Sequence, residues 1–296
     1  MASRPAGSNV PPVIVVVGET GSGKTALAIE LAKQFNGEII SADSRTVYRG
    51  MDIGTAKPTP KERQRVPHYG FDVVEPDGQF TAYDFQQLAQ KCVADITARH
   101  KLPIIVGGTG LYIDAYLYNF TFRARADRTV RSELQTLTTT ELQKQVLDAG
   151  LVLPENAQNP RHLRRLLEAG PPPKQIKTLR LNTLVLGLSM LRGELEQRVT
   201  ARVEAMLDSG LVDEVKALTD RYGSVEALHA PGYKAFGAYL KGEIDLAEAK
   251  RQVIRDDLSL AKRQRTWFKR NPNIHWLEGE DKLTQAIKLV SVFLHR

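Results

Sequence analysis

Four residues near the start of the chain have the spacing of a loop that binds phosphate. In the stretch VIVVVGETGSGKTALAIELA, Gly18, Gly23, Lys24 and Thr25 fit the pattern G-x-x-x-x-G-K-T. In such a loop, called a P-loop, backbone N–H groups surround phosphate oxygens, the lysine neutralises their charge and the threonine hydroxyl binds Mg²⁺. We therefore predict a phosphate-binding loop that uses Mg²⁺ as its cofactor.

The loop by itself does not decide which reaction follows. Transfer of a phosphoryl group and departure of diphosphate from carbon both develop negative charge on the oxygens that the loop would hold. A second candidate is Asp43, which comes just after the predicted strand EIIS, where its carboxylate could accept a proton from a nucleophile. Taken alone, an aspartate in this position is more often a turn or helix cap than a base.

Alternating strands and helices must bring these groups together. Apolar runs, separated by helix-like segments, predict strands at Val13–Val17, Glu38–Ser41, Pro103–Val106 and Thr183–Met190. This order indicates an α/β fold with a P-loop NTPase-like, doubly wound parallel sheet, in which ligands bind at the carboxyl ends of the strands. The P-loop, Asp43 and the GGTG segment that contains Thr109 are all expected at that edge.

The chain is expected to have one core, interrupted by an insertion. Residues 1–12 lack an apolar segment and predict a disordered leader, not a signal peptide. Residues 13–120 and 181–296 form the predicted catalytic core with C-terminal helices, and residues 121–180 an all-helical, basic insertion. An apolar stripe from Leu195 to Leu207 predicts a helix with Gly210 as its C-cap.

The composition is that of a globular protein, and its positive charge suggests a polyanionic partner, although many proteins with this charge have none. The net charge is +7 over 296 residues, and basic residues cluster in the insertion and in KRQRTWFKR, Lys262 to Arg270. Each cluster alone is more often a solvated face than an RNA site. The single cysteine, Cys92, excludes an intrachain disulfide and fits the cytoplasm. No apolar run reaches membrane-spanning length, and we expect a monomer.

Longer motifs make the chain similar to a known family. GETGSGKTALAIELA, ISADSRTVYRGMDIGTAKP, VPHYGFDVVEP, VGGTGLY, PGYKA and AKRQRTWFKR occur in the order and approximate spacing of the tRNA dimethylallyltransferases, also called tRNA isopentenyltransferases. The resemblance extends from Val13 to about Trp276. It implies transfer of a dimethylallyl group from dimethylallyl diphosphate to the exocyclic N6 amine of the adenine next to the tRNA anticodon, with release of diphosphate.

The resemblance also implies roles for individual residues. Asp43 would be the general base, Thr109 would position the amine and diphosphate, and Lys24 would neutralise the leaving group, with Thr25 binding Mg²⁺. The implied diphosphate-binding residues are Gly18, Thr20, Gly21, Ser22, Gly23, Lys24, Thr25 and Arg198. The implied tRNA-binding residues are Asp43, Ser44, Arg45, Thr46, Arg131, Arg161, His162, Leu163, Arg164, Arg165, His229, Gly232, Tyr233, Lys234, Lys262, Arg263, Arg265 and Lys269. An adenine in an anticodon stem-loop must be flipped into a pocket, and the helical insertion is expected to hold the RNA.

The chain departs from the family pattern at several positions. Glu19 stands where the family usually has proline, which places a negative charge near the diphosphate unless the side chain points away. Arg45-Thr46, Arg161-His162 and Lys234 also replace usual residues, and lysine does not reproduce bidentate recognition by arginine.

Other functions remain open from the residues alone. An isopentenyltransferase acting on free adenine nucleotides would need neither the basic insertion nor the C-terminal helices. A small-molecule kinase would share the P-loop and a carboxylate base, and a nucleotide-switched RNA-binding protein would not depend on Asp43. Thr109 could be only a turn residue, Trp267 and Phe268 are expected in a helix core, and the six histidines offer no zinc-binding pattern.

Overall fold

The computed structural model describes residues 10–60, 63, 66–123, 128–171, 173, 175 and 177–295. Most of the predicted leader, residues 1–9, and the basic residue Lys174 lie outside the described residues. The chain forms two units, one made of residues 1–119 and 179–296 and the other of residues 120–178. The second unit corresponds to the predicted insertion, 121–180, with boundaries that differ by one and two residues.

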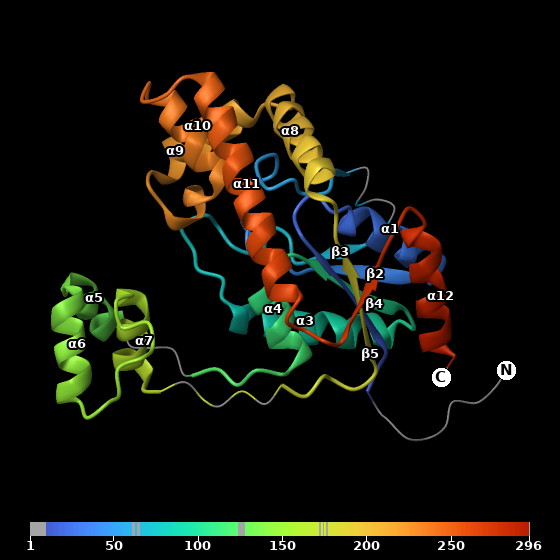
Figure 1. The fold of residues 1–296 in the computed structure, drawn as a ribbon, viewed down its shortest axis with the longest axis horizontal. Helices are drawn as coiled ribbons and strands as arrows, with labels where there is room; N and C mark the ends of the chain where they lie inside the picture. Colours follow the sequence, from blue (N-terminus) through green and yellow to red (C-terminus); the bar gives the residue numbers. More distant parts are fainter. Residues whose placement is uncertain are drawn as a thin grey trace. The chain divides into compact units, whose positions relative to one another are not determined.

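A parallel sheet is the centre of the first unit, and it confirms the predicted fold class (Figure 1). Among the described residues its strands lie in the order β3-β2-β4-β1-β5-β6, and every neighbouring pair is parallel. The strands are β1 (Val13–Gly18), β2 (Gly37–Ser41), β3 (His68–Tyr69), β4 (Leu102–Gly107), β5 (Thr183–Leu188) and β6 (Ile274–Leu277). Every residue of β1, β2 and β4 is buried, as expected for strands covered on both faces.

Two details of the sheet differ from the prediction. The strand predicted to reach Met190 ends at Leu188, because the backbone N–H of Met190 donates to Glu19 Oε1 instead of to a neighbouring strand. The edge strands β3 and β6 were not predicted, since two and four residues are too few to show a periodic pattern.

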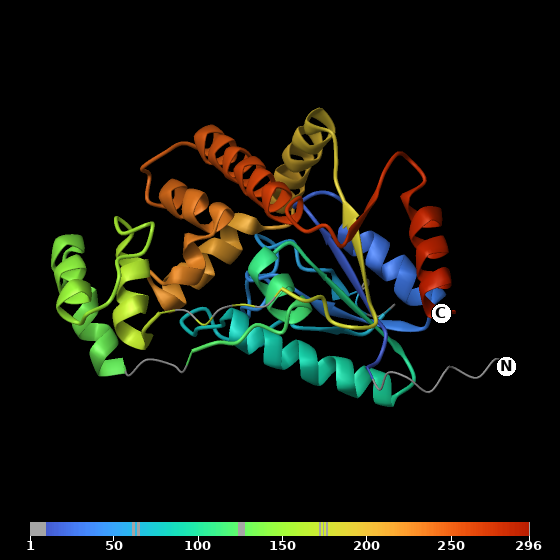
Figure 2. The same cartoon turned by 60° about the horizontal axis from the view of Figure 1, so that its bottom comes forward.

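Helices cover both faces of the sheet. On one face α1 (Lys24–Gln34) and α12 (Lys282–Leu294) pack against Ile14, Val16 and their neighbours in one apolar cluster. On the other face lie α3 (Ala82–Ala98) and α4 (Gly110–Leu117), as Figure 2 shows, and α11 (Leu246–Phe268) contacts both β1 and α4. The carboxyl-end loops therefore leave the sheet between packed helices.

A second apolar cluster is formed by the C-terminal helices. It joins α8 (Arg192–Asp208), α9 (Leu211–Tyr222), the short η1 (Glu226–His229), α10 (Pro231–Leu240) and α11. Val47, Tyr48 and Met51 pack into the same cluster, so these helices anchor the segment that follows Asp43. Gly210, the predicted C-cap of α8, lies one residue beyond the observed C-cap, which is Ser209. Gly210 has a φ of 95°, a value that favours glycine.

The second unit is helical in its described part. It contains α5 (Arg128–Thr136), α6 (Thr139–Asp148) and α7 (Pro160–Ala169), which share an apolar cluster around Leu142 and Leu163. Thr138 and Glu141 form a capping box at the start of α6, and Asn159 caps α7. In neither unit is any described helix both long and apolar enough to cross a membrane.

Candidate active site

The P-loop connects β1 to α1 and has the geometry of an anion-binding turn. Gly21 and Gly23 have φ values of 80° and 87°, which side chains rarely adopt, so glycine is required at both positions. Gly23 is also the N-cap of α1, and no side chain in the described part of the chain caps this helix. The backbone N–H groups of its first turn are thus available to an anion.

Ser22 and Lys24 are two polar side chains of the loop that favour a bound anion. Ser22 is 4% exposed, and its Oγ has no hydrogen-bond partner among the described residues. Burial lowers the pKa of the Lys24 ammonium to about 8, with Arg202 acting in the same direction and Asp43 and Glu19 opposing it. A buried hydroxyl without a partner is costly and a buried ammonium favours an anion, so the loop fits a diphosphate.

The side chain of Glu19 points away from the phosphate-binding loop. Its carboxylate accepts hydrogen bonds from Arg265 Nε and Nη2, both at 2.7 Å, and from the Met190 N–H at 2.9 Å. Only its backbone carbonyl faces Lys24, whose Nζ donates to it at 3.3 Å. The departure from the family pattern therefore adds no free carboxylate to the loop.

Asp43 and Thr109 follow two neighbouring strands, β2 and β4. Asp43 Oδ1 accepts from the N–H of Arg45 at 2.8 Å, and its other carboxylate oxygen has no partner among the described residues. Thr109 Oγ1 accepts from the N–H of Ser44 at 2.9 Å. Since β1 lies on the other side of β4, Asp43, Thr109 and Lys24 come from the ends of three adjacent strands.

Two arginines of α8 approach the P-loop. Arg198 Nη1 donates to the carbonyl of Gly21 at 3.4 Å, next to the turn that would hold diphosphate. Arg202, one helical turn further along, is close enough to lower the pKa of Lys24 and forms an ion pair with Asp257 of α11. We did not single out Arg202 from the sequence, although its i+4 spacing from Arg198 placed both on one helix face.

Among the described residues, protein side chains alone do not build a site for magnesium. The described residues contain no group of three or more His, Cys, Asp or Glu that could hold a metal ion. Thr25 is half-buried and is the second residue of α1, next to Lys24, where the P-loop pattern places a hydroxyl that binds Mg²⁺. This donor set suits Mg²⁺ held jointly with diphosphate oxygens, because Mg²⁺ is usually bound by few protein groups and by substrate phosphates.

Many of the predicted tRNA-binding residues have accessible side chains. Exposed residues include Arg131, Arg161, His162 and Arg165 in the second unit and His229, Lys234, Lys262, Arg263 and Lys269 in the first. Ser44, Arg45 and Arg164 are partly buried. Arg164 Nε donates to the Leu134 carbonyl, which orients its side chain on α7.

The structure corrects the prediction for several side chains. Leu163 is 0% exposed and Tyr233 is 2% exposed, so neither side chain can contact RNA. Tyr233 donates instead to Glu214, whose carboxylate also accepts from the N–H groups of residues 52–54. Gly232 and Thr46 are buried as well, and Arg265 is engaged by Glu19. These buried or paired side chains instead fix the positions of the segments around them.

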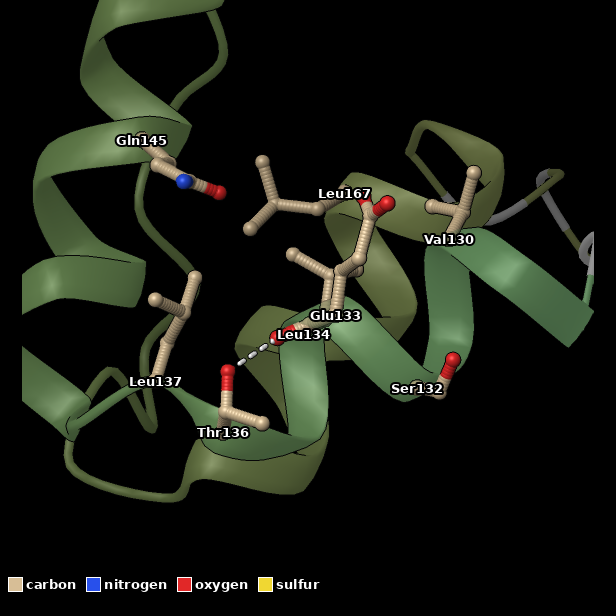
Figure 3. Close-up of a pocket in the computed structure, with 8 residues that line it drawn as sticks. All are labelled: Val130, Ser132, Glu133, Leu134, Thr136, Leu137, Gln145 and Leu167. Carbon is tan, nitrogen blue, oxygen red and sulfur yellow. Dashed lines mark hydrogen bonds between the residues drawn. The ribbon is translucent and has the colours of Figure 1, made fainter.

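A separate pocket in the second unit has different chemistry. It has a volume of about 700 Å³ and lies between α5, α6 and α7 (Figure 3). Leu134, Leu137 and Leu167 line it together with the carboxylate of Glu133, and no lysine or arginine is among its lining residues. It therefore does not suit a diphosphate.

Comparison with known proteins gives a consistent result over nearly the whole chain. A family model described as IPP transferase matches residues 46–271. The tRNA dimethylallyltransferase of Staphylococcus epidermidis is 39% identical over 290 residues, and the match covers 91% of this chain and 87% of that protein. The enzyme of the same name from Staphylococcus aureus is 40% identical over 303 residues, covering 94% and 96%.

Solved structures agree with these sequence matches. The full-length tRNA isopentenylpyrophosphate transferase of Bacillus halodurans has a TM-score of 0.74 at 35% identity, with 97% of each chain covered. A eukaryotic dimethylallyltransferase described as acting on tRNA has a TM-score of 0.83 at 26% identity, covering 97% of this chain and 80% of that one.

Proposed function

Since this chain belongs to the IPP transferase family, we propose a reaction for it in which the groups at three adjacent strand ends act on one substrate pair. The chain is a transferase that prenylates tRNA. We propose dimethylallyl diphosphate as the donor and the N6 amine of the adenine 3′ to the anticodon, in the anticodon stem-loop, as the acceptor. The reaction would take place in the cytoplasm.

The transfer exchanges one bond to carbon for another. The amine nitrogen forms a bond to C1 of the dimethylallyl group as the bond from C1 to the diphosphate oxygen breaks. Asp43 takes the proton from the amine, whose lone pair is delocalised into the adenine ring and which is therefore a weak nucleophile. Thr109 orients the Asp43 segment through the Ser44 N–H.

The P-loop stabilises the leaving diphosphate. Lys24, the backbone N–H groups and Arg198 would surround its oxygens, where negative charge develops as the bond to carbon breaks. Mg²⁺ would be held by the Thr25 hydroxyl and the diphosphate, and it supplies further positive charge to the leaving group. The Ser22 hydroxyl, which has no partner among the described residues, would donate to the same group.

One observation supports this proposal most strongly. Asp43, Thr109 and Lys24 follow β2, β4 and β1, which are neighbours in the sheet. A base and a diphosphate site at adjacent strand ends match an acceptor that loses a proton while the donor loses diphosphate.

The test is a transfer assay with Asp43→Asn. Asparagine keeps an Oδ1 that can accept from the Arg45 N–H, so the loop is retained while the base is lost. With Mg²⁺, labelled dimethylallyl diphosphate and unmodified tRNA that carries adenines after the anticodon, we expect wild-type protein to form prenylated adenosine. The variant should be slower by about 100-fold or more. Asp208→Asn, at an exposed position, serves as the matched control.

Other outcomes would identify the alternatives. Label on free AMP or ATP but not on tRNA would indicate an enzyme for free nucleotides. Consumption of ATP without prenyl transfer would indicate a kinase, and tRNA binding that is insensitive to Asp43→Asn without any transfer would indicate a nucleotide-switched RNA-binding protein.

A further inference from the structure

The pair formed by Glu19 and Arg265 joins the phosphate-binding loop to the last turns of α11. The Glu19 side chain is 1% exposed and that of Arg265 is 30% exposed. Both carboxylate oxygens are engaged, because Arg265 Nε donates to Oε2 and Nη2 donates to Oε1. Arg265 Nη2 also donates to the Met190 carbonyl at 2.8 Å, which places this cation between the P-loop and the end of β5.

The neighbouring residue of α11 holds the next residue of the loop. Gln264 is 9% exposed, and its Oε1 accepts from the Thr20 N–H at 2.7 Å. Consecutive loop residues are thus bound by consecutive helix residues. The Glu19 carbonyl accepts from the Ser22 N–H and from Lys24 Nζ, so the position of Glu19 is transmitted to the two polar groups of the diphosphate site.

A carboxylate at position 19 needs this partner. The side chain is removed from water and lies on the same residue whose carbonyl contacts Lys24. Without a cation beside it, the carboxylate would be a buried charge without compensation, and rotation toward Lys24 would be its nearest alternative. That rotation would place negative charge where the diphosphate binds.

We propose that Arg265 is a positioning residue of the diphosphate site and not a contact to tRNA. It holds the Glu19 carboxylate away from the phosphate oxygens. The inference rests on the proposed function, because it assumes that the P-loop binds diphosphate. Lys262, Arg263 and Lys269, which are exposed on or beside the same helix end, keep their predicted role toward RNA.

Removal of the Arg265 cation and removal of the Glu19 charge should affect diphosphate binding to different extents. Arg265→Met leaves the buried carboxylate without its cation, and we expect it to weaken binding of Mg²⁺-diphosphate by about tenfold or more. Glu19→Gln removes the negative charge and should change binding less than threefold. The double variant should recover most of the lost affinity, since it has no carboxylate at position 19 that could turn toward the diphosphate.

Titration calorimetry of the purified full chain with Mg²⁺-diphosphate measures this directly. In steady-state transfer assays, Arg265→Met should show a raised KM for the prenyl donor and an unchanged KM for tRNA. Arg251→Met, which breaks the exposed pair of Arg251 and Glu248 on the same helix, is the matched control. Arg265→Lys replaces Arg265→Met if the latter does not fold, and it should show a smaller loss because it keeps the charge without the bidentate geometry.

The outcomes separate this inference from the proposed function. If wild-type protein does not bind Mg²⁺-diphosphate, the proposed function fails and this inference fails with it. If wild-type protein binds and Arg265→Met binds equally well, only the inference is wrong. A raised KM for tRNA that Glu19→Gln does not restore would return Arg265 to the RNA-binding surface.

Discussion

A close contact between the two segments that carry Asp43 and Thr109 can be tested by adding a single methyl group. Gly107 is the last residue of β4, and a Cβ built there would lie 2.1 Å from the Ala42 oxygen, 2.4 Å from its carbonyl carbon and 2.7 Å from its Cβ. Ordinary van der Waals contacts of a Cβ atom begin at 3.4 Å. Gly107→Ala therefore forces the backbones of residues 107 and 42 apart by about 1 Å.

The displaced atoms belong to the link between the two loops. The Ala42 carbonyl accepts from the Thr109 N–H at 3.2 Å, and the Ala42 N–H donates to the Val106 carbonyl at 2.7 Å. Asp43 follows directly in the chain and must move with Ala42. A misplacement of about 1 Å between reacting groups costs about 100-fold in rate, and overpacking of this kind costs about 1–3 kcal/mol of stability.

The assay is single-turnover prenyl transfer to tRNA at saturating donor, with the melting temperature measured on the same samples. We expect Gly107→Ala to remain folded at 25 °C, with a rate lower by about 100-fold and a smaller change in Mg²⁺-diphosphate affinity. Gly193→Ala is the control, because nothing lies within 4 Å of its Cβ. A rate within threefold of wild type for Gly107→Ala would refute the role that we assign to this contact.

Three further changes test other parts of the structure. Burial raises the pKa of Glu38, but hydrogen bonds from Lys101, Arg99 and Tyr69 outweigh it and leave that pKa below its usual value. The ionised Glu38 therefore stabilises the fold above its unfolded-state pKa, and this stabilisation is lost as pH falls through its folded-state pKa. We expect Glu38→Gln to flatten the acid limb of a plot of unfolding free energy against pH. Lys57, whose side chain is 1% exposed and paired with two aspartates, anchors the segment after Asp43. Lys57→Met leaves the Tyr48 carbonyl without its donor and should lower the unfolding free energy in urea by about 1–3 kcal/mol, and an unchanged midpoint would contradict this. Thr109→Val removes the acceptor for the Ser44 N–H and should slow transfer by about tenfold, whereas Thr109→Ser should retain most of the rate.

Local patterns were sufficient to predict the main elements of the site. The P-loop glycines need backbone conformations that few other residues adopt, and β1 and β4 are apolar runs because both faces of the sheet are covered. The lack of an apolar strand-like run between Thr121 and Arg180 predicted the helical insertion. These features depend on neighbours within a few residues, so the sequence shows them directly.

Pairing across long distances in the chain was decided only by the tertiary structure. The sequence placed a charge at Glu19 next to the phosphate site but could not show its direction, because its partner Arg265 is 246 residues away. The strand order, which sets Asp43, Thr109 and Lys24 side by side, likewise follows from how the sheet is assembled. Burial of Tyr233 and Leu163 depends on helices that pack against one another. Residue type and spacing determined which groups could do the chemistry, and packing determined which of them face the substrate, because burial and charge pairing are properties of the folded chain.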